Sequence, residues 1–336
     1  MDSNAAGQPS DWLVLGADIG GTSTRILLAG YDGAPLRRGS AGGGNPVSHP
    51  DTAAAALAEA LREAFAGIDP ARVRAAVVGV AGGSALDQPE VRDAFDRVWS
   101  DIGLSCSPTY APDLAVAFAS GTADADGTVV IAGTGAVAGA VRDRHIVRTA
   151  DGHGWLLGDD GSGYWLGREA ARVTLGTLDA DEPPGALASS VLHELGATRA
   201  ADAVAKSDPN AARARVIHTL NTRAPVRLAE LAPLVVAAAA AHDPEAERIV
   251  DEAARLLART VARIRQPDEV TPIVLAGSLA REDSPVGAKL RTLVGERFQG
   301  PLLSASNGVG GAAWLALAEA EPSAATDEAR TRLTAT

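Results

Sequence analysis

The chain has 336 residues, of which 46 % are apolar but only 4 % aromatic, with a formal net charge of −12 and a pI near 5.0. This length favours two domains, whose cores Ala, Leu and Val must fill. The acidic balance argues against binding of nucleic acid or an anionic membrane by bulk electrostatics, which needs a basic face.

The expected location is the cytoplasm. Residues 1–11 are polar and acidic, so they lack the basic start and apolar centre of a secretion signal. The longest apolar run, residues 234–241, is too short to span a bilayer. Cys106 is the only cysteine, which excludes intrachain disulfides and cysteine-based metal sites by count.

The first motif is an apolar run that ends in Asp18, turns through Gly20 and Gly21, and resumes after three hydroxyl residues. This pattern predicts a β-hairpin. The glycines let the backbone approach a charged oxygen, and the N–H groups of residues 21–24 would supply donors to an anion. Asp18 is positioned to hold a hydrated Mg²⁺ beside a polyphosphate. An ordinary hairpin with a Gly-Gly turn is the alternative.

The rest of the first half alternates strands and helices. Residues 35–40 and 74–80 are expected to be strands, and residues 51–66 and 90–99 have helical spacing. Such alternation suggests parallel crossovers, whose carboxyl ends usually carry ligands. Asn45, in a glycine-rich loop, can offer a donor and an acceptor to a ligand, or it can be a turn residue before proline.

Asp113 follows a strand-like stretch and precedes an Ala-rich helix. This is the position of an N-cap, and capping alone explains an Asp there. A carboxylate at the carboxyl end of a strand can also take a proton from a substrate hydroxyl. Both interpretations can hold together.

Residues 128–141 repeat the first motif, with Gly133, Thr134 and Gly135 in the turn. Two such hairpins facing each other across a cleft can hold a phosphate chain from both sides and exclude water. The turn also fits the dinucleotide pattern G-x-G-x-x-A, with Asp151 downstream. We disfavour that interpretation, because the pattern must open a helix and the residues that follow suggest a strand.

The most densely patterned stretch is a glycine-rich loop with the acids Asp159 and Asp160, before a helix capped near Ser162. The acids can accept hydrogen bonds from sugar hydroxyls, and Trp155 or Trp165 can cover an apolar sugar face. The alternative is a capping pair of acids with both tryptophans in the core.

Residues 179–268 are predicted to be a mostly helical insertion, with helices at 186–195, 211–220, 228–241 and 244–265. A strand at 272–279, a helix at 285–298, a short strand at 301–304 and a helix through Glu319 complete the second half. Small residues in two loops, Gly277 with Ser278 and Gly310 with Gly311, would let a planar adenine lie against backbone. Close helix packing is the alternative for the second pair.

With these motifs in place, the chain resembles the actin-like ATPase superfamily of sugar kinases over about residues 12–320 and, within it, the N-acetylglucosamine kinase branch. Residues 18–22 look like the first phosphate motif of the family, residues 133–135 like the second, and residues 276–278 like the adenosine motif. Residues 158–165 are similar to a segment particular to this branch. The order and spacing of the motifs carry the resemblance.

The resemblance implies an α/β fold of two actin-like ATPase (ribonuclease H-like) domains with an interdomain cleft that closes when the sugar binds. We assign the first domain, on the sugar and phosphate side, to residues 1–120. The second, on the nucleotide side, covers 121–320 and holds the helical insertion, and the C-terminal tail, 321–336, can pack back on the first domain. A homodimer is left open.

The resemblance also implies ATP-dependent phosphorylation of a sugar at a primary hydroxyl, taken to be O6, with Mg²⁺. Asp113 becomes the general base, and Asp18 serves Mg²⁺. The implied sugar contacts are Asn45, Asp113, Thr134, Gly135, His153, Gly154, Asp159 and Asp160. The implied ATP contacts are Gly20, Gly21, Thr22, Ser23, Thr24, Gly133, Thr134, Gly135, Gly277, Ser278, Gly310 and Gly311.

Three residues depart from the family pattern. His153 stands where relatives carry Trp, Ala81 where they more often have Ser, and Pro112 precedes the expected base in place of a polar residue. A pocket with His153, Asp151 and the two neighbouring acids suits a free ammonium better than an acetamido methyl. Glucosamine is therefore preferred over N-acetylglucosamine, with an N-acetylglucosamine kinase or a broader hexose kinase as the alternative.

Three alternative functions from other classes of protein are weighed against a sugar kinase. An ATP-dependent activase of a radical enzyme shares the fold but needs more than one cysteine for its iron–sulfur cluster, and Cys106 stands alone. A sugar-responsive transcription regulator needs an added DNA-binding module, for which the short segment before the first strand leaves no room. A non-catalytic sensor of ATP and sugar is compatible with the sequence, although the presence of Asp18 and Asp113 disfavours it.

Overall fold

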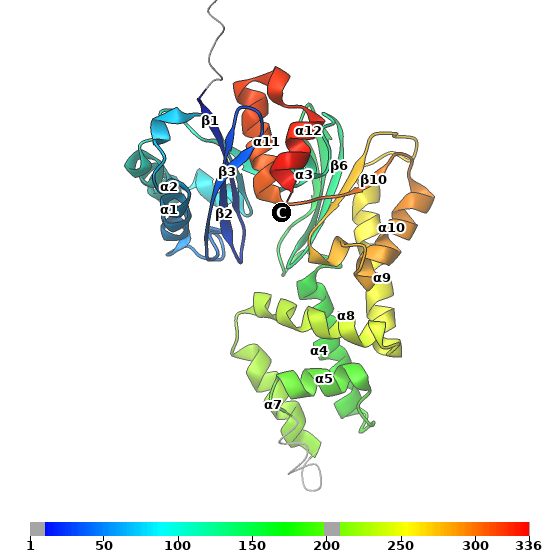
Figure 1. Ribbon diagram of the computed structural model, residues 1–336. Helices are drawn as coiled ribbons and strands as arrows, with labels where there is room; N and C mark the ends of the chain where they lie inside the picture. The colour runs from blue at the N-terminus through cyan, green and yellow to red at the C-terminus, as the bar shows by residue number, and fades with distance from the viewer. Residues whose placement is uncertain (1–10, 198–208, 336) are drawn as a thin grey trace, which may run out of the picture. The chain divides into compact units, whose positions relative to one another are not determined.

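The computed structural model describes residues 11–197 and 209–335 (Figure 1). The N-terminal segment on which the expected location rests, and part of the predicted helical insertion, therefore lie outside the described residues. The chain forms two compact units. Unit 1 contains the residues up to Gly127, Val141–Ile146 and the residues from Leu303 onward, and unit 2 contains Thr128–Ala140 and Val147–Leu302.

Unit 1 is built on a five-stranded sheet with the strand order β3-β2-β1-β4-β5. Strands β1 and β2 are antiparallel, with Ile19 opposite Thr24, so the first predicted hairpin is present. Strands β1, β4 and β5 run parallel to one another. The strands are β1 (Leu13–Ile19), β2 (Thr24–Gly30), β3 (Pro35–Ala41), β4 (Val73–Val80) and β5 (Thr109–Pro112).

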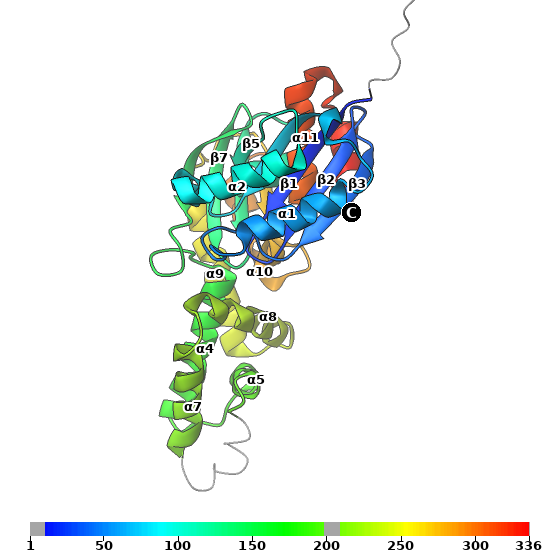
Figure 2. The same cartoon turned by 90° about the vertical axis from the view of Figure 1, so that its left-hand side faces the viewer.

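Helices cover both faces of this sheet (Figure 2). One face packs against α1 and α2, and the other against α3, α11 and α12. Alternate residues of β1 enter the two cores, Leu15 on one face and Val14 on the other, which explains why the strand is a continuous apolar run. The helices are α1 (Ala53–Ala64), α2 (Pro89–Ile102), α3 (Asp113–Gly121), α11 (Gly308–Ala320) and α12 (Asp327–Thr334).

The assignment of residues 303–320 to the second domain is corrected by the structure. Helix α11 packs on the sheet of unit 1, where Gly16 of β1 lies so close that an added Cβ would be 2.3 Å from the Ala313 nitrogen. The apolar helix therefore completes the core of the first unit although it is last but one in the chain. Local sequence carries no sign of such a long-range return.

Unit 2 is built on a second five-stranded sheet with the order β10-β9-β6-β7-β8, in which β6 and β9 are parallel. The Gly133–Gly135 bend leads directly into strand β7, so the rejection of the dinucleotide pattern is confirmed. The strands are β6 (Gly127–Ala132), β7 (Ala136–Arg142), β8 (His145–Asp151), β9 (Ile273–Ala276) and β10 (Leu302–Ser304).

The helices of this half share one apolar core with its sheet. They are α4 (Gly163–Asp179), α5 (Ala186–Glu194), α7 (Pro209–Asn221), α8 (Ala232–Ala240), α9 (Pro244–Ala262) and α10 (Pro285–Arg297). The helix predicted at 228–241 is instead a 3₁₀ segment, Pro225–Leu231, followed by α8. Pro233 lies in the first turn of α8, where its missing N–H costs nothing, so a new helix begins there.

Across the described ranges, no single helix has both the length and the hydropathy needed to cross a bilayer. One sharply bent pair, Pro225–Ala240 with Pro244–Ala262, meets these two criteria only when its members are taken together.

Candidate active site

The first glycine bend joins β1 to β2. The Gly20 N–H donates to the Ser23 carbonyl at 2.9 Å, and the Gly20 carbonyl accepts from the N–H groups of Gly44 and Asn45. An added Cβ at Gly20 would have its nearest neighbour 3.5 Å away, and one at Gly21 would have its nearest 3.9 Å away. These two glycines are therefore not required by crowding within the chain, which leaves room for the backbone to meet a ligand. Thr22 and Ser23 complete the bend and remain predicted contacts.

Thr24, one of the predicted ATP contacts, has a packing role. Its side chain is fully buried, and the Oγ1 atom has no hydrogen-bond partner. It points toward Gly44, where an added Cβ would be 2.4 Å from Oγ1. Thr24 is therefore part of the packing between the bend and the loop that crosses it.

Asp18 and Asp113 lie at the same edge of the unit 1 sheet. Asp18 is level with Gly79 of β4, which is level with Ala111 of β5, and Asp113 follows directly after β5. The pKa of Asp113 is raised to about 6: burial raises it most, the Leu114 N–H lowers it, and the charge of Asp18 adds to the rise. The parallel strands thus bring a proton acceptor and a second carboxylate together.

The predicted N-cap role of Asp113 is wrong by one residue. Helix α3 begins at Asp113 itself, and Pro112 occupies the N-cap position. The Asp113 carboxylate accepts the N–H of the next residue, Leu114, at 2.9 Å. One oxygen is held in place by this bond, which orients the carboxylate.

The surroundings of Asp18 suit the role of a magnesium ligand. Among the described residues its carboxylate accepts no hydrogen bond, and burial raises its pKa while Arg25 lowers it. Its Oδ2 atom lies where a Cβ on Gly308 would be 2.6 Å away, so the start of α11 reaches the carboxylate only because residue 308 is glycine. Mg²⁺ is typically bound by one or two carboxylates together with water and phosphate oxygens. Within the described ranges, no group of three or more His, Cys, Asp or Glu is arranged to hold a metal ion. Sequence analysis missed Gly308.

Asn45 adopts the turn that the sequence offered as its alternative role. Its Oδ1 atom accepts the N–H of Val47 at 2.8 Å and of Ser48 at 3.3 Å. Its amide NH₂ makes no hydrogen bond within the described ranges and is free to donate. Asn45 therefore remains a predicted sugar contact through a donor alone.

The second bend, Gly133–Gly135, is tied to the start of α4. Its carbonyls accept the first N–H groups of that helix, Gly163 N to Gly133 O at 2.7 Å and Tyr164 N to Thr134 O at 3.1 Å. Asp159 Oδ1 accepts the N–H of Ala136 at 3.1 Å, and an added Cβ on Gly135 would be 2.9 Å from the same oxygen. The structure thus brings the predicted residues Thr134, Gly135 and Asp159 together within unit 2.

Asp151 organises the acidic loop instead of facing a ligand. It is buried, and its two oxygens accept three backbone N–H groups, those of Gly152 at 2.8 Å, Asp159 at 2.7 Å and Asp160 at 3.0 Å. Both Asp151 and Asp159 have positive φ, near 63° and 57°, a strained conformation that such bonds can hold. Burial raises the pKa of Asp159, the Ala136 N–H lowers it, and Asp151 and Asp160 raise it.

The rest of this loop is open to solvent. His153 and Gly154 are exposed, Gly154 with φ near 80°. Trp155 is 39 % exposed, whereas Trp165 is buried in the core, so only Trp155 can cover a sugar face. Ser162 caps α4 by accepting the Trp165 N–H at 3.2 Å, so the two preceding acids are not the cap.

A cavity of about 490 Å³ opens at the carboxyl ends of β6 and β9 in unit 2. Gly133, Thr134 and Ser278 line it at the strand ends, and an apolar face of α8 forms one wall. These three are predicted ATP contacts, and small residues beside a flat apolar wall suit a nucleoside.

The three remaining predicted ATP contacts have packing roles. Gly277 has φ near 92°, and a Cβ there would be 2.3 Å from the Ala132 carbonyl, so it allows β9 to meet β6. Gly310 and Gly311 are buried within α11. A Cβ on Gly310 would be 2.4 Å from the Leu333 carbonyl, and one on Gly311 would be 2.1 Å from that of Val116. Close helix packing, the alternative that the sequence offered, thus requires both glycines, and their contact with ATP stays a prediction.

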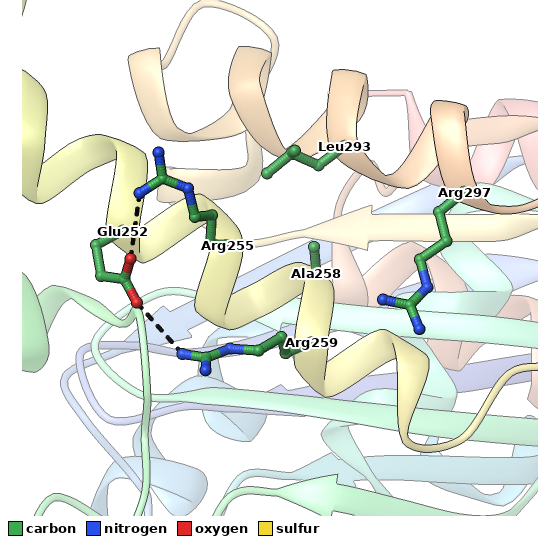
Figure 3. Close-up of a pocket in the computed structure, with 6 residues that line it drawn as sticks. All are labelled: Glu252, Arg255, Ala258, Arg259, Leu293 and Arg297. Atoms are coloured by element: carbon green, nitrogen blue, oxygen red, sulfur yellow. Dashed lines mark hydrogen bonds and ion pairs between the residues drawn. The ribbon is translucent and has the colours of Figure 1, made fainter.

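A second hollow, of about 370 Å³, lies between α9 and α10 (Figure 3). Arg255 and Arg259 both donate to Glu252, at 3.2 and 3.3 Å, and Arg297 approaches from α10. No backbone bend with small residues reaches this hollow. It therefore lacks the features that a nucleotide needs.

Two mixed sheets, each opened by a glycine bend, with helices packed on them, define the two-domain α/β fold of the actin-like ATPases. A family model for the BadF/BadG/BcrA/BcrD ATPase family matches residues 15–316, and the chain belongs to this family. The fold resemblance stated from the sequence is thereby confirmed.

The relatives include named kinases. An N-acetyl-D-glucosamine kinase of Dictyostelium discoideum is 28 % identical over 73 % of this chain and 76 % of its own. A structure provisionally named N-acetylglucosamine kinase, from Chromobacterium violaceum, is 28 % identical with a TM-score of 0.69, covering 92 % of this chain and 100 % of that one. A glucokinase of the ROK family from Streptomyces griseus, solved with glucose and AMPPNP, is similar in fold alone, at 19 % identity and a TM-score of 0.53, covering 90 % of this chain and 99 % of that one.

Proposed function

We propose that the chain is an ATP-dependent sugar kinase that phosphorylates the 6-hydroxyl of an amino sugar. The observation that carries the proposal is Asp113, an oriented carboxylate with a pKa near 6 at the carboxyl edge of the unit 1 sheet, next to Asp18. A general base works best when its pKa lies near the working pH. Membership in an ATPase family and relatives named as sugar kinases support the same conclusion.

The proposed chemistry uses few groups. Asp113 accepts the proton of the sugar hydroxyl and orients its oxygen toward the γ-phosphate of ATP. Asp18 would hold Mg²⁺, which neutralises charge on the phosphates when bound. The N–H groups at Gly20–Ser23 and Gly133–Gly135 would bind phosphate oxygens, and the unit 2 cavity would hold the nucleoside. The reaction requires ATP and the sugar to be bound at the same time.

Glucosamine is the proposed acceptor, because the Asp160 carboxylate and the second oxygen of Asp159 remain available to an ammonium group. Asp151 is not available to the ammonium group, because both of its oxygens accept backbone N–H groups. N-acetylglucosamine is the second candidate. It is favoured by the names of the relatives and by the exposed apolar side chains of Trp155, Leu156 and Leu157 in the same loop. A primary hydroxyl is proposed as the acceptor because it is the least hindered alcohol of a hexose.

A coupled ADP-release assay with glucosamine, N-acetylglucosamine, glucose and mannose, with and without Mg²⁺, tests the proposal. We expect Mg²⁺-dependent turnover with an amino sugar, loss of turnover in Asp113→Asn with ATP binding retained, and no change in the exposed control Asp101→Asn. Faster reaction of N-acetylglucosamine would overturn the preference for glucosamine. Binding of ATP and sugar without turnover by the wild type would instead identify a sensor.

A further inference from the structure

Ser284 combines three features that are unusual together. It occupies the N-cap position of α10 but makes no capping hydrogen bond. It is only 7 % exposed, and its Oγ atom has no partner. It also lines the unit 2 cavity, next to Pro285. Ser at an N-cap normally accepts an N–H of the first turn, so this hydroxyl has an unused hydrogen-bonding capacity.

The other polar side chains at the cavity, those of Asp283, Thr134 and Ser278, differ from Ser284 in their surroundings. The Asp283 carboxylate receives two hydrogen bonds from the Arg281 guanidinium, both at 2.9 Å. Thr134 and Ser278 lie at the strand ends, next to the predicted phosphate bend. The remaining wall is apolar, with Ala232, Val236 and Ala240 one turn apart on α8. Among the polar side chains that line this cavity, Ser284 is the one whose hydroxyl is buried without a hydrogen-bond partner.

We propose that the Ser284 hydroxyl hydrogen-bonds to the purine base of the ATP bound in this cavity and so determines nucleotide affinity. This inference rests on the proposed function, because it requires a nucleotide in the cavity. A planar base suits the apolar face of α8, and a hydroxyl can donate to a ring nitrogen or accept from an exocyclic amino group. Ligand binding then satisfies a buried group that the free protein leaves unpaired.

The test is the affinity for AMP-PNP, measured by calorimetry on the full chain. We expect Ser284→Ala to bind about fivefold more weakly than the wild type, the loss expected for one neutral hydrogen bond. Ser284→Thr, which keeps a hydroxyl, should regain most of the affinity, and the exposed control Ser189→Ala should not change it. Inorganic tripolyphosphate, which lacks the nucleoside, should bind wild type and Ser284→Ala equally.

A purely structural role gives a different pattern. If Ser284 served as a helix cap, Ser284→Ala would lower the melting temperature of the free protein and leave AMP-PNP affinity unchanged, and that result overturns the inference. We expect the free Ser284→Ala variant to melt at or above the wild-type temperature. We also expect AMP-PNP to raise its melting temperature by less than it raises that of the wild type. Failure of the wild type to bind AMP-PNP would overturn the proposed function together with this inference, whereas equal binding by both proteins overturns this inference alone.

Discussion

Asp113→Asn should make the protein more stable at pH 8 while it abolishes turnover. Burial raises the pKa of Asp113 from 3.8 to about 6. At pH values between 3.8 and about 6, Asp113 therefore keeps its proton in the folded state but has lost it in the unfolded state. The wild type loses up to about 3 kcal/mol of unfolding free energy as pH rises through this window. Asn carries no charge to bury, and its side-chain oxygen can still accept the Leu114 N–H.

Urea unfolding at pH 4 and pH 8 measures this effect. The difference between variant and wild type is informative because the other carboxylates titrate in both proteins and cancel. We expect Asp113→Asn to gain on the order of 2–3 kcal/mol relative to wild type between pH 4 and pH 8, and Asp101→Asn to gain nothing. An Asp113→Asn variant that tracks the wild type across this range would refute the claim that burial of the charge sets the pKa.

Three further predictions concern activity. The kcat/KM for the sugar should rise with pH and level off above about 6, because Asp113 accepts a proton only when it is ionised; a rate profile flat from pH 5 to 8 would exclude it as the base. Gly308→Ala should weaken Mg²⁺ activation and lower kcat on the order of tenfold, measured by Mg²⁺ titration, since its Cβ would meet Asp18 Oδ2 at 2.6 Å. Asp151→Ala should raise the sugar KM about tenfold with the KM for ATP unchanged, because three loop N–H groups lose their acceptor; equal effects on both KM values would contradict a role confined to the loop.

The local parts of the fold could be predicted from the sequence. The bends after Ile19 and Ala132 are marked by adjacent small and hydroxyl residues between apolar runs, and both are present as hairpin turns. The return of α11 to the unit 1 sheet could not be predicted, because it depends on Gly16 of β1 and the backbone near Ala313 fitting each other across nearly the whole chain. Such complementarity leaves no periodic pattern.

The site residues also differ in whether local sequence reveals their role. Asp113 could be found because a carboxylate after a strand is visible in the sequence. Thr24, which looks like its hydroxyl neighbours, is buried by a loop that crosses the bend, and only the structure reveals this. The roles of Asp151 and Ser284 are visible only in their side-chain hydrogen bonds: the Asp151 carboxylate accepts three, and the Ser284 hydroxyl makes none. Residue type alone does not distinguish these cases.

The most direct test of a sugar kinase is the product itself. A ³¹P NMR time course with the protein, ATP, Mg²⁺ and either glucosamine or N-acetylglucosamine should show a phosphate monoester of the sugar that grows in step with ADP and is missing with Asp113→Asn. Release of inorganic phosphate in place of the monoester, or no consumption of ATP with either amino sugar, would contradict the account.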